Sequence, residues 1–247
     1  MKKSLLFLTL LLSSLSLSVT ALHADQRLFG YSYQADSIMP EGKWEIESVI
    51  TRKPLSNNES KWYVSQELEY GLTPRLTTAL YLNSQITPES TEFKGISSEW
   101  KYMVLSPNVN PIGVMVYGEL KMTADSYELE EKLILQHNID DWVLVSNIVL
   151  EQEFEVEDNE NTKKGVLEVY GAAAYKFSPS FALGFEAKMK KVYADFGSES
   201  DAMNFFGPSF HYENEKWTTA ITILSEIDSD LDLFENIYSR WVVGYSL

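Results

Sequence analysis

From Lys43 onward, apolar side chains recur at every second position, and this period restricts the fold more than any other feature of the sequence. In KWYVSQELEY, for example, Trp62 and Leu68 lie on one face of an extended chain and Glu67 lies on the other. A period of two is typical of strands with one apolar face and one polar face. The sequence therefore predicts an all-β fold of about twelve strands, which start near residues 43, 61, 76, 94, 112, 126, 142, 166, 181, 203, 217 and 237.

The connections between these strands fall into two classes. Short turns alternate strictly with longer loops that are polar and mostly acidic. With an even number of strands, this alternation is typical of bacterial outer-membrane barrels, which have short periplasmic turns and longer extracellular loops. A ten-residue strand tilted by about 45° rises roughly 23 Å, close to an apolar band of about 25 Å. The predicted short turns are 71–75, 106–111, 138–141, 178–180 and 213–216, and the long loops are 53–60, 84–93, 121–126, 155–165, 191–202 and 227–236.

We therefore predict a transmembrane up-and-down antiparallel β-barrel over residues 43–247. The last strand, RWVVGYSL, has to pair with the first strand to close it. It also resembles the carboxy-terminal signal that outer-membrane proteins present to the barrel-assembly machinery, with Leu247 in place of the usual Phe. Aromatic residues cluster at the strand ends next to the short turns and predict an interfacial girdle: Trp44, Tyr70, Tyr102, Trp142, Tyr175, Phe181, Tyr212, Trp217 and Tyr245.

Residues 1–24 have the layout of a secretory signal peptide, with cleavage after Ala21 or Ala24. An uncleaved membrane anchor is the alternative, although it needs about 20 apolar residues. The chain has no Cys, which excludes disulfides and lipoprotein attachment, and its formal net charge of −16 argues against binding nucleic acid. Residues 25–42 match neither strand nor helix. They are predicted to lie either at the periplasmic rim or inside the lumen.

Several segments together resemble an uncharacterised family of exported β-barrel proteins of Gram-negative bacteria. The resemblance extends over most of the chain and implies a barrel in the cell outer membrane. It implies no particular activity. The segments that carry it are LFGYSYQADSIMPEGKWE (28–45), LEYGLTPRL (68–76), EWKYMVLSPNVNPIGVMVYGE (99–119), FFGPSFHYENEKW (205–217) and the terminal VVGYSL.

The polar face of the strands is rich in charged residues. Rings of acidic side chains select cations, so one interpretation is a water-filled, cation-favouring passage. The other is a closed barrel whose interior charges pair across strands, since small barrels are filled by side chains. The predicted lumen-lining residues are Glu45, Glu47, Glu67, Glu69, Glu99, Lys101, Glu119, Lys121, Glu128, Glu130, Lys132, Glu151, Glu153, Glu168, Glu186, Lys188 and Arg240.

Beyond the signal peptide, the histidines are His137 and His211. Without a Cys or a close His pair they do not form a metal site of recognisable spacing, and no cofactor site is predicted. Both are predicted to be interface residues near the short-turn rim. A lipid hydrolase would need a His beside a nucleophilic Ser. His137 and Ser146, on adjacent strands with the same parity, are the candidates.

Three residues fit the strand pattern poorly. Glu131 and Gln66 have lipid-facing parity within strands, where a polar group is unfavourable. Pro208 removes a ladder donor from the tenth strand, so a β-bulge is predicted there. A register shift at a bulge would move such residues inward.

Three functions remain open. The first is a porin-like transport channel for small solutes that favours cations. The second is a non-conducting barrel with a structural or interaction role, whose acidic loops bind divalent cations beside lipopolysaccharide. The third is a membrane-embedded lipid-modifying enzyme, and a soluble β protein is the alternative to all three. The expected partners are outer-membrane lipid, lipopolysaccharide and the barrel-assembly machinery.

Overall fold

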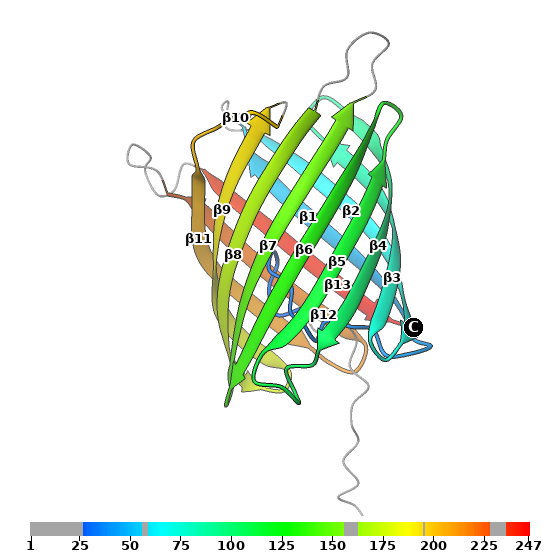
Figure 1. Ribbon diagram of the computed structural model, residues 1–247, viewed down its shortest axis with the longest axis vertical. Helices are drawn as coiled ribbons and strands as arrows, with labels where there is room; N and C mark the ends of the chain where they lie inside the picture. The colour runs from blue at the N-terminus through cyan, green and yellow to red at the C-terminus, as the bar shows by residue number, and fades with distance from the viewer. Residues whose placement is uncertain (1–26, 56–58, 156–162, 195, 228–235) are drawn as a thin grey trace, which may run out of the picture.

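The structure, a computed structural model, describes residues 27–55, 59–155, 163–194, 196–227 and 236–247. The predicted signal peptide lies outside these residues. Within them, twelve long antiparallel strands and one two-residue strand form a single closed barrel (Figure 1). The strands are β1 (Trp44–Pro54), β2 (Ser60–Thr73), β3 (Leu76–Ile86), β4 (Thr91–Leu105), β5 (Gly113–Met122), β6 (Ser126–Ile139), β7 (Trp142–Glu155), β8 (Lys163–Ser178), β9 (Phe181–Ala194), the short β10 (Ser198–Glu199), β11 (Met203–Glu213), β12 (Trp217–Glu226) and β13 (Ile237–Ser246).

The barrel closes where its first and last strands meet. β13 pairs with β1, with Tyr245 opposite Ile46 and Arg240 opposite Thr51. Each of the other long strands pairs with its neighbours in chain order, except that β9 pairs with β11 and the short β10 adds to the end of β9. The prediction of a closed up-and-down barrel, completed by the carboxy-terminal strand, is confirmed.

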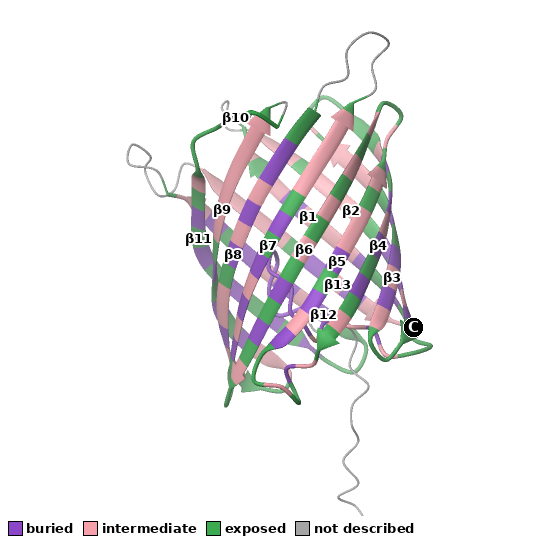
Figure 2. Ribbon diagram, viewed as in Figure 1, coloured by how far each residue is buried: buried purple, intermediate pink, exposed green. Residues whose placement is uncertain are grey.

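Exposed and buried residues alternate along the strands (Figure 2). On neighbouring positions of β3, Leu80 is 64% exposed whereas Ala79 is 1% exposed, and on β4 Trp100 is 50% exposed whereas Glu99 is fully buried. The wall therefore turns apolar side chains outward and charged ones inward, which is the reverse of a soluble protein. None of the described residues forms a helix long and apolar enough to cross a membrane.

The nine residues of the predicted girdle lie on the outer face at the end of the barrel that carries the short turns. Facing rings on adjacent strands contact one another: Trp44 and Tyr70 have ring centroids 4.4 Å apart. The corresponding distance is 4.7 Å for Trp217 and Tyr245. These cross-strand aromatic pairs follow from the register, because their members lie directly opposite each other. Their place at a membrane interface stays a prediction.

Strand boundaries differ from the prediction at the long-loop end. The predicted loops 84–93 and 121–126 shrink to residues 87–90 and 123–125, because β3 and β4 continue to Ile86 and from Thr91, and β6 begins at Ser126. On the short-turn side, the connection 106–112 is longer than either of these. Polar composition suggested loops where the chain forms strand, because strand ends outside an apolar band need no apolar face.

The predicted bulge at Pro208 is wrong. Register is the same on both sides of Gly207 and Pro208, with Phe206 opposite Ser225 and Ser209 opposite Thr222. Gly207 permits this, since a Cβ there would lie 1.8 Å from the carbonyl oxygen of Ile223 on β12. Register shifts occur instead at Gly71/Thr73, Leu82/Ser84, Met103/Leu105 and Lys176/Ser178.

Glu131 and Gln66 keep the outward orientation that their parity predicts, and no register shift moves them inward. Both are exposed on the outer face of the barrel. Gln66 accepts a hydrogen bond of 2.9 Å from the hydroxyl of Ser48 on the neighbouring strand. Glu131 lies opposite Gly118, which leaves open space beside its side chain.

Candidate functional site

The chain before β1 lies inside the barrel. We call residues 27–39 the inner segment; Figure 1 shows it in blue, enclosed by the wall in the half that carries the short turns. Phe29 and Ala35 are completely buried, and Met39 is 1% exposed. The sequence left two positions open for this part of the chain, the periplasmic rim and the lumen. Residues 27–39 lie in the lumen.

A single carboxylate on β9 holds the first bend of the inner segment. Glu186 accepts hydrogen bonds from the backbone N–H groups of Gly30 (3.0 Å), Tyr31 (3.2 Å) and Ser32 (2.7 Å). The hydroxyls of Ser32 and of Thr222 on β12 also donate to it, at 2.8 and 2.5 Å. Gly30 is required here, because a Cβ would lie 2.9 Å from the Thr222 hydroxyl oxygen. Successive N–H groups that converge on an anion form strong, charge-assisted bonds.

The opposite wall binds the middle of the inner segment through side-chain amides. Asn147 on β7 accepts from the N–H of Tyr33 at 2.7 Å and donates to its carbonyl oxygen at 3.0 Å. Gln136 on β6 accepts from the N–H of Ala35 at 2.7 Å. A side-chain amide opposite an extended residue can pair with both the N–H and the carbonyl group of that residue, as an adjacent strand would.

The two ends of the inner segment are also attached to the wall. Arg27 forms an ion pair of 2.5 Å with Glu47 on β1, and its carbonyl oxygen accepts a 2.9 Å hydrogen bond from His211 on β11. The N–H of Met39 donates to the Thr77 hydroxyl on β3 at 2.9 Å. Contacts from β1, β3, β6, β7, β9, β11 and β12 thus surround the inner segment. His211 is 2% exposed and faces inward, so its predicted interface position is wrong.

Apolar contacts accompany these polar ones. Leu28 and Phe29 pack into a slot of inward-facing apolar residues, and Tyr33 and Ala35 pack into a second one. Burial of a side chain such as Phe29 contributes about 2–3 kcal/mol. The first slot is formed by Val143, Val145, Ala174 and Ala182, and the second by Met115, Tyr117 and Ile134.

Burial changes the acidity of two tyrosines of the inner segment. The pKa of Tyr31 rises to about 12, chiefly because burial disfavours the phenolate, and the nearby Arg240 opposes this rise. Burial likewise raises the pKa of Tyr33, against the opposing charges of Arg27 and Lys132. Both side chains therefore stay neutral at physiological pH.

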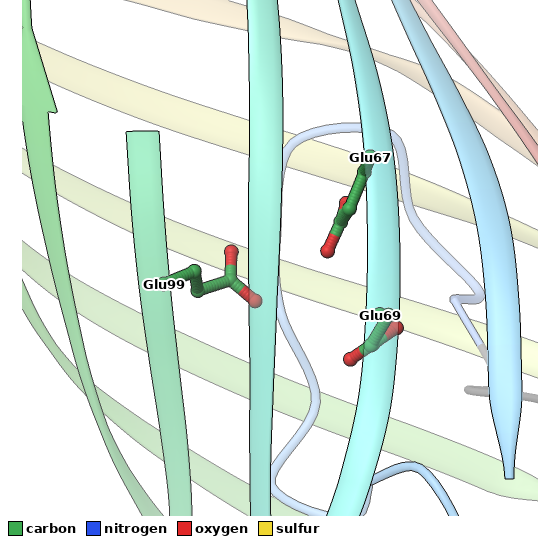
Figure 3. Close-up of side chains that lie close together, drawn as sticks. All are labelled: Glu67, Glu69 and Glu99. Atoms are coloured by element: carbon green, nitrogen blue, oxygen red, sulfur yellow. The ribbon is translucent and has the colours of Figure 1, made fainter. Parts of the chain in front are cut away.

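Three predicted lumen residues form a buried carboxylate group beside the inner segment (Figure 3). Glu67 and Glu69 come from β2 and Glu99 from β4, and each has an oxygen within 4.8 Å of the others. They meet across β3 because Ala79, between Glu69 and Glu99, is too small to separate them. Lys101 forms ion pairs with Glu69 and, at 3.4 Å, with Glu99. A cation of the protein itself therefore already lies within the group.

The long-loop half of the barrel contains a cavity of about 580 Å³, which we call the outer cavity. Arg27, Tyr31 and Tyr33 of the inner segment line it, so the inner segment forms its floor. Ten predicted lumen residues line its sides: Glu119, Lys121, Glu128, Glu130, Lys132, Glu151, Glu153, Glu168, Lys188 and Arg240. The other seven, which are buried around the inner segment, are Glu45, Glu47, Glu67, Glu69, Glu99, Lys101 and Glu186.

The sequence analysis missed the uncharged residues that bind the inner segment. Thr77, Gln136, Asn147, Ser209 and Thr222 have inward parity but carry no charge, and parity alone does not distinguish them from other polar wall residues. Apolar residues at inward-facing positions were a usable signal that something covers the inner face of the wall. WVLVSNIVL (142–150) is apolar on both faces, which indicates that both faces are covered.

The structure does not juxtapose the candidate hydrolase pair. His137 lies opposite Leu144, and Ser146 lies opposite Leu135, so the pair is diagonal. Diagonal neighbours are roughly 7–8 Å apart, whereas a nucleophile and its base need about 3 Å. The Nδ1 atom of His137 lies 2.5 Å from the carbonyl oxygen of Pro111.

Comparison with known proteins relates the chain to one sequence family and to several solved barrels. A family model described as "Family of unknown function (DUF6662)" matches residues 21–240. A comparison with curated protein sequences gave no significant match.

Three solved structures that are similar to this one are titled as a channel or as porins. The COG4313 outer membrane channel from Pseudomonas putida F1 aligns with a TM-score of 0.61 at 9% identity, over 85% of this chain and 97% of that one. The KdgM porin in complex with disordered oligogalacturonate aligns with a TM-score of 0.55 at 11% identity, over 82% and 99%. The NanC porin gives 0.55 at 12% identity, over 82% and 100%. At these identities the likeness establishes the barrel fold.

Proposed function

Because the matched model spans most of the chain, the chain belongs to the DUF6662 family, and we propose that it is an outer-membrane channel for small solutes that its inner segment holds shut. The exposed apolar side chains on the outer face support a place in a lipid bilayer. One solved structure that shares the fold is titled an outer membrane channel and others are titled porins, which supports the same location.

The observation that carries this proposal is the position of the inner segment. It occupies the lumen in the short-turn half and, among the described residues, forms hydrogen bonds or ion pairs with side chains of seven of the twelve long strands. Solutes therefore need the inner segment to move before they can pass. No strand has to break for that movement, since the hydrogen bonds described above between residues 27–39 and the wall are made by side chains of the wall.

The cation preference of the proposed channel would arise in the short-turn half. Once the inner segment moves, the carboxylates that face it would line the passage, and rings of acidic groups favour cations. Lys101 is the buried lysine among them. The buried glutamates of this half are Glu45, Glu47, Glu67, Glu69, Glu99, Glu186 and Glu213.

One feature favours a second candidate function, a barrel that never conducts. The slot of Val143, Val145, Ala174 and Ala182 would face water if the inner segment left. An apolar stretch of wall is unfavourable in a water-filled passage. Permanent filling would suit a structural or interaction role.

Single-channel conductance in a planar bilayer distinguishes the two. The exported protein and a variant that lacks residues 25–42 are refolded, and their insertion is verified before current is recorded under a salt gradient. We expect the exported protein to be silent most of the time, and the shortened variant to show stepwise conductance with a cation-selective reversal potential. Two inserted but silent forms would exclude the channel, and full conductance of the exported protein would show that the inner segment does not close it.

Thiol labelling measures movement of the inner segment directly. The chain has no Cys, so Ala35→Cys introduces a single thiol at a completely buried position. Slow labelling by a polar thiol reagent is expected in the folded protein. Val109→Cys, in an exposed turn, provides the fast reference.

A further inference from the structure

The charges of the outer cavity are divided between two sides. On one side Lys53 of β1, Lys188 and Lys190 of β9 and Arg240 of β13 act electrostatically on one another. Glu168 of β8 binds Lys188 at 2.8 Å and Lys190 at 3.1 Å. Four cations therefore share this one ion-pairing carboxylate among the residues that line the cavity. We call the four the cationic side of the outer cavity.

The other side has the opposite balance. Lys121 pairs with Glu128 at 3.3 Å, and Lys132 pairs with Glu130 at 2.7 Å. Lys164 pairs with Glu153 at 3.0 Å, and the same wall also carries Glu119 and Glu151. Every cation of this acidic side thus has its own carboxylate. β6 of the acidic side and β13 of the cationic side lie six strands apart around the twelve-strand ring, and the two sides adjoin where β9 pairs with β8.

The uncompensated charge on the cationic side is unusual for this chain. Its formal net charge is −16, yet these four cations face into a confined space with one carboxylate among them. Arg240 donates one hydrogen bond, of 2.9 Å, to the Thr51 hydroxyl, and its guanidinium lies 4.3 Å above the ring of Tyr31. Partly enclosed cations that lack carboxylates form strong bonds with anions.

Aromatic rings adjoin the cations. Tyr31, Tyr170 and Phe205 lie within 6 Å of the Lys188 ammonium, and Tyr238 contacts Phe205 with ring centroids 5.0 Å apart. The buried hydroxyl of Tyr31 has no hydrogen-bond partner among the described residues. Ligand sites combine such flat apolar surfaces with a few polar groups in cavities of roughly 300–1,000 Å³, and this cavity is of that size.

We propose that the outer cavity binds a small hydroxylated organic anion, such as a sugar acid, with its carboxylate against Lys53, Lys190 and Arg240 and its ring against the aromatic residues. Ser65, Asn83 and the tyrosines of the cavity supply hydrogen-bonding groups for hydroxyls. The site lies above the inner segment. Because Tyr31 belongs to that segment, the site is complete while the segment is docked, and it goes beyond the proposed transport function.

Calorimetric titration of the full-length refolded protein in detergent tests this assignment. The probes are D-glucuronate, D-glucose, which has the same ring without the charge, and inorganic phosphate, which has charge without the ring. We expect D-glucuronate to bind, with an affinity that falls as salt rises, and both other probes to bind at least tenfold more weakly. Equal binding of glucose, tighter binding of phosphate, or no binding of glucuronate would overturn the proposal.

Two double variants locate the site. Lys53→Gln with Arg240→Gln removes two cations that form no ion pair with a carboxylate among the described residues of the cavity, and we expect at least a tenfold loss of glucuronate affinity. Lys121→Gln with Lys164→Gln removes the same charge from the acidic side and should change affinity less than twofold. An equal loss in both variants would show a nonspecific charge effect and no site. Because the titration records no current, its result is independent of whether the channel conducts.

Discussion

Two glutamates on neighbouring strands show how the halves of this barrel differ. Glu186 of β9 and Glu168 of β8 both face inward, yet Glu186 accepts three backbone N–H groups of the inner segment, whereas Glu168 pairs with Lys188 and Lys190. In the short-turn half the wall binds main chain, and in the long-loop half it balances charge. Depth along the strand, and not the face of the strand, therefore decides what an inward carboxylate does.

The largest effect is expected when the apolar contact between the inner segment and the wall is removed. Phe29→Asp places a charge in the slot that Phe29 fills, which loses its burial energy and adds an unpaired buried charge. We expect docking to weaken by about 4 kcal/mol, so that the Ala35→Cys thiol is labelled about a thousandfold faster. Val109→Asp, at an exposed turn, should leave the rate unchanged. Unaltered labelling in the Phe29 variant would mean that the slot does not hold the inner segment.

Removing the charge of Glu186 is expected to give the next largest effect, and removing the charge of Glu168 provides the comparison. Glu186→Gln replaces a carboxylate that accepts several hydrogen bonds, and we expect docking to weaken by about 3 kcal/mol, which corresponds to roughly 150-fold faster labelling. Glu168→Gln should change the labelling rate less than threefold, because it binds no backbone of the inner segment. Similar rates for the two variants would remove the distinction between the halves.

Removing a side-chain amide that binds the inner segment is expected to give a smaller effect. Asn147→Ala removes both hydrogen bonds to Tyr33 and leaves its buried backbone groups unpaired, which should weaken docking by about 2 kcal/mol and speed labelling roughly 30-fold. Asn83→Ala removes a side chain of the outer cavity that bonds to Ser97 on the wall. If docking depends on the short-turn half alone, this control keeps the original labelling rate.

Alkaline pH should loosen the inner segment slightly. Docked Tyr31 holds its proton up to a pKa of about 12, whereas the undocked side chain ionises near its ordinary value of about 10. The docked state therefore binds more protons between these values, and docking weakens as pH rises through this range. At pH 11 the loss is about 1.4 kcal/mol, or about tenfold in channel opening. In Tyr31→Phe, this part of the increase in single-channel open probability between pH 9 and pH 11 should disappear.

The wall of the barrel could be predicted from the sequence because lipid imposes a strict period of two on its outer face. Trp62, Leu68 and Trp100 keep that period whatever lies inside. Strand ends were less predictable, since residues such as Thr91 and Glu92 pair beyond the apolar band and need no pattern. At Pro208 a local rule predicted a bulge, but the small Gly207 beside it allows β12 to approach without a register shift.

The interior was predictable only in part. Parity identified the inward charges, but a period of two contains no information about what lies opposite them. Whether Glu186 meets a lysine, water or the backbone of Ser32 depends on a chain segment without any periodicity of its own. The partners of His211 were hidden for the same reason, because its carbonyl acceptor belongs to Arg27, far away in the sequence.

The slot around Leu28 and Phe29 also affects how this protein reaches its folded state. Residues 40–43 join the inner segment to β1, and β1 is the strand that β13 must meet to complete the ring. If the ring closed without the segment, the valines and alanines of that slot would be exposed to water inside the barrel. We therefore expect the segment to serve as a template around which the sheet curls, and heat to melt it together with the wall in one cooperative transition.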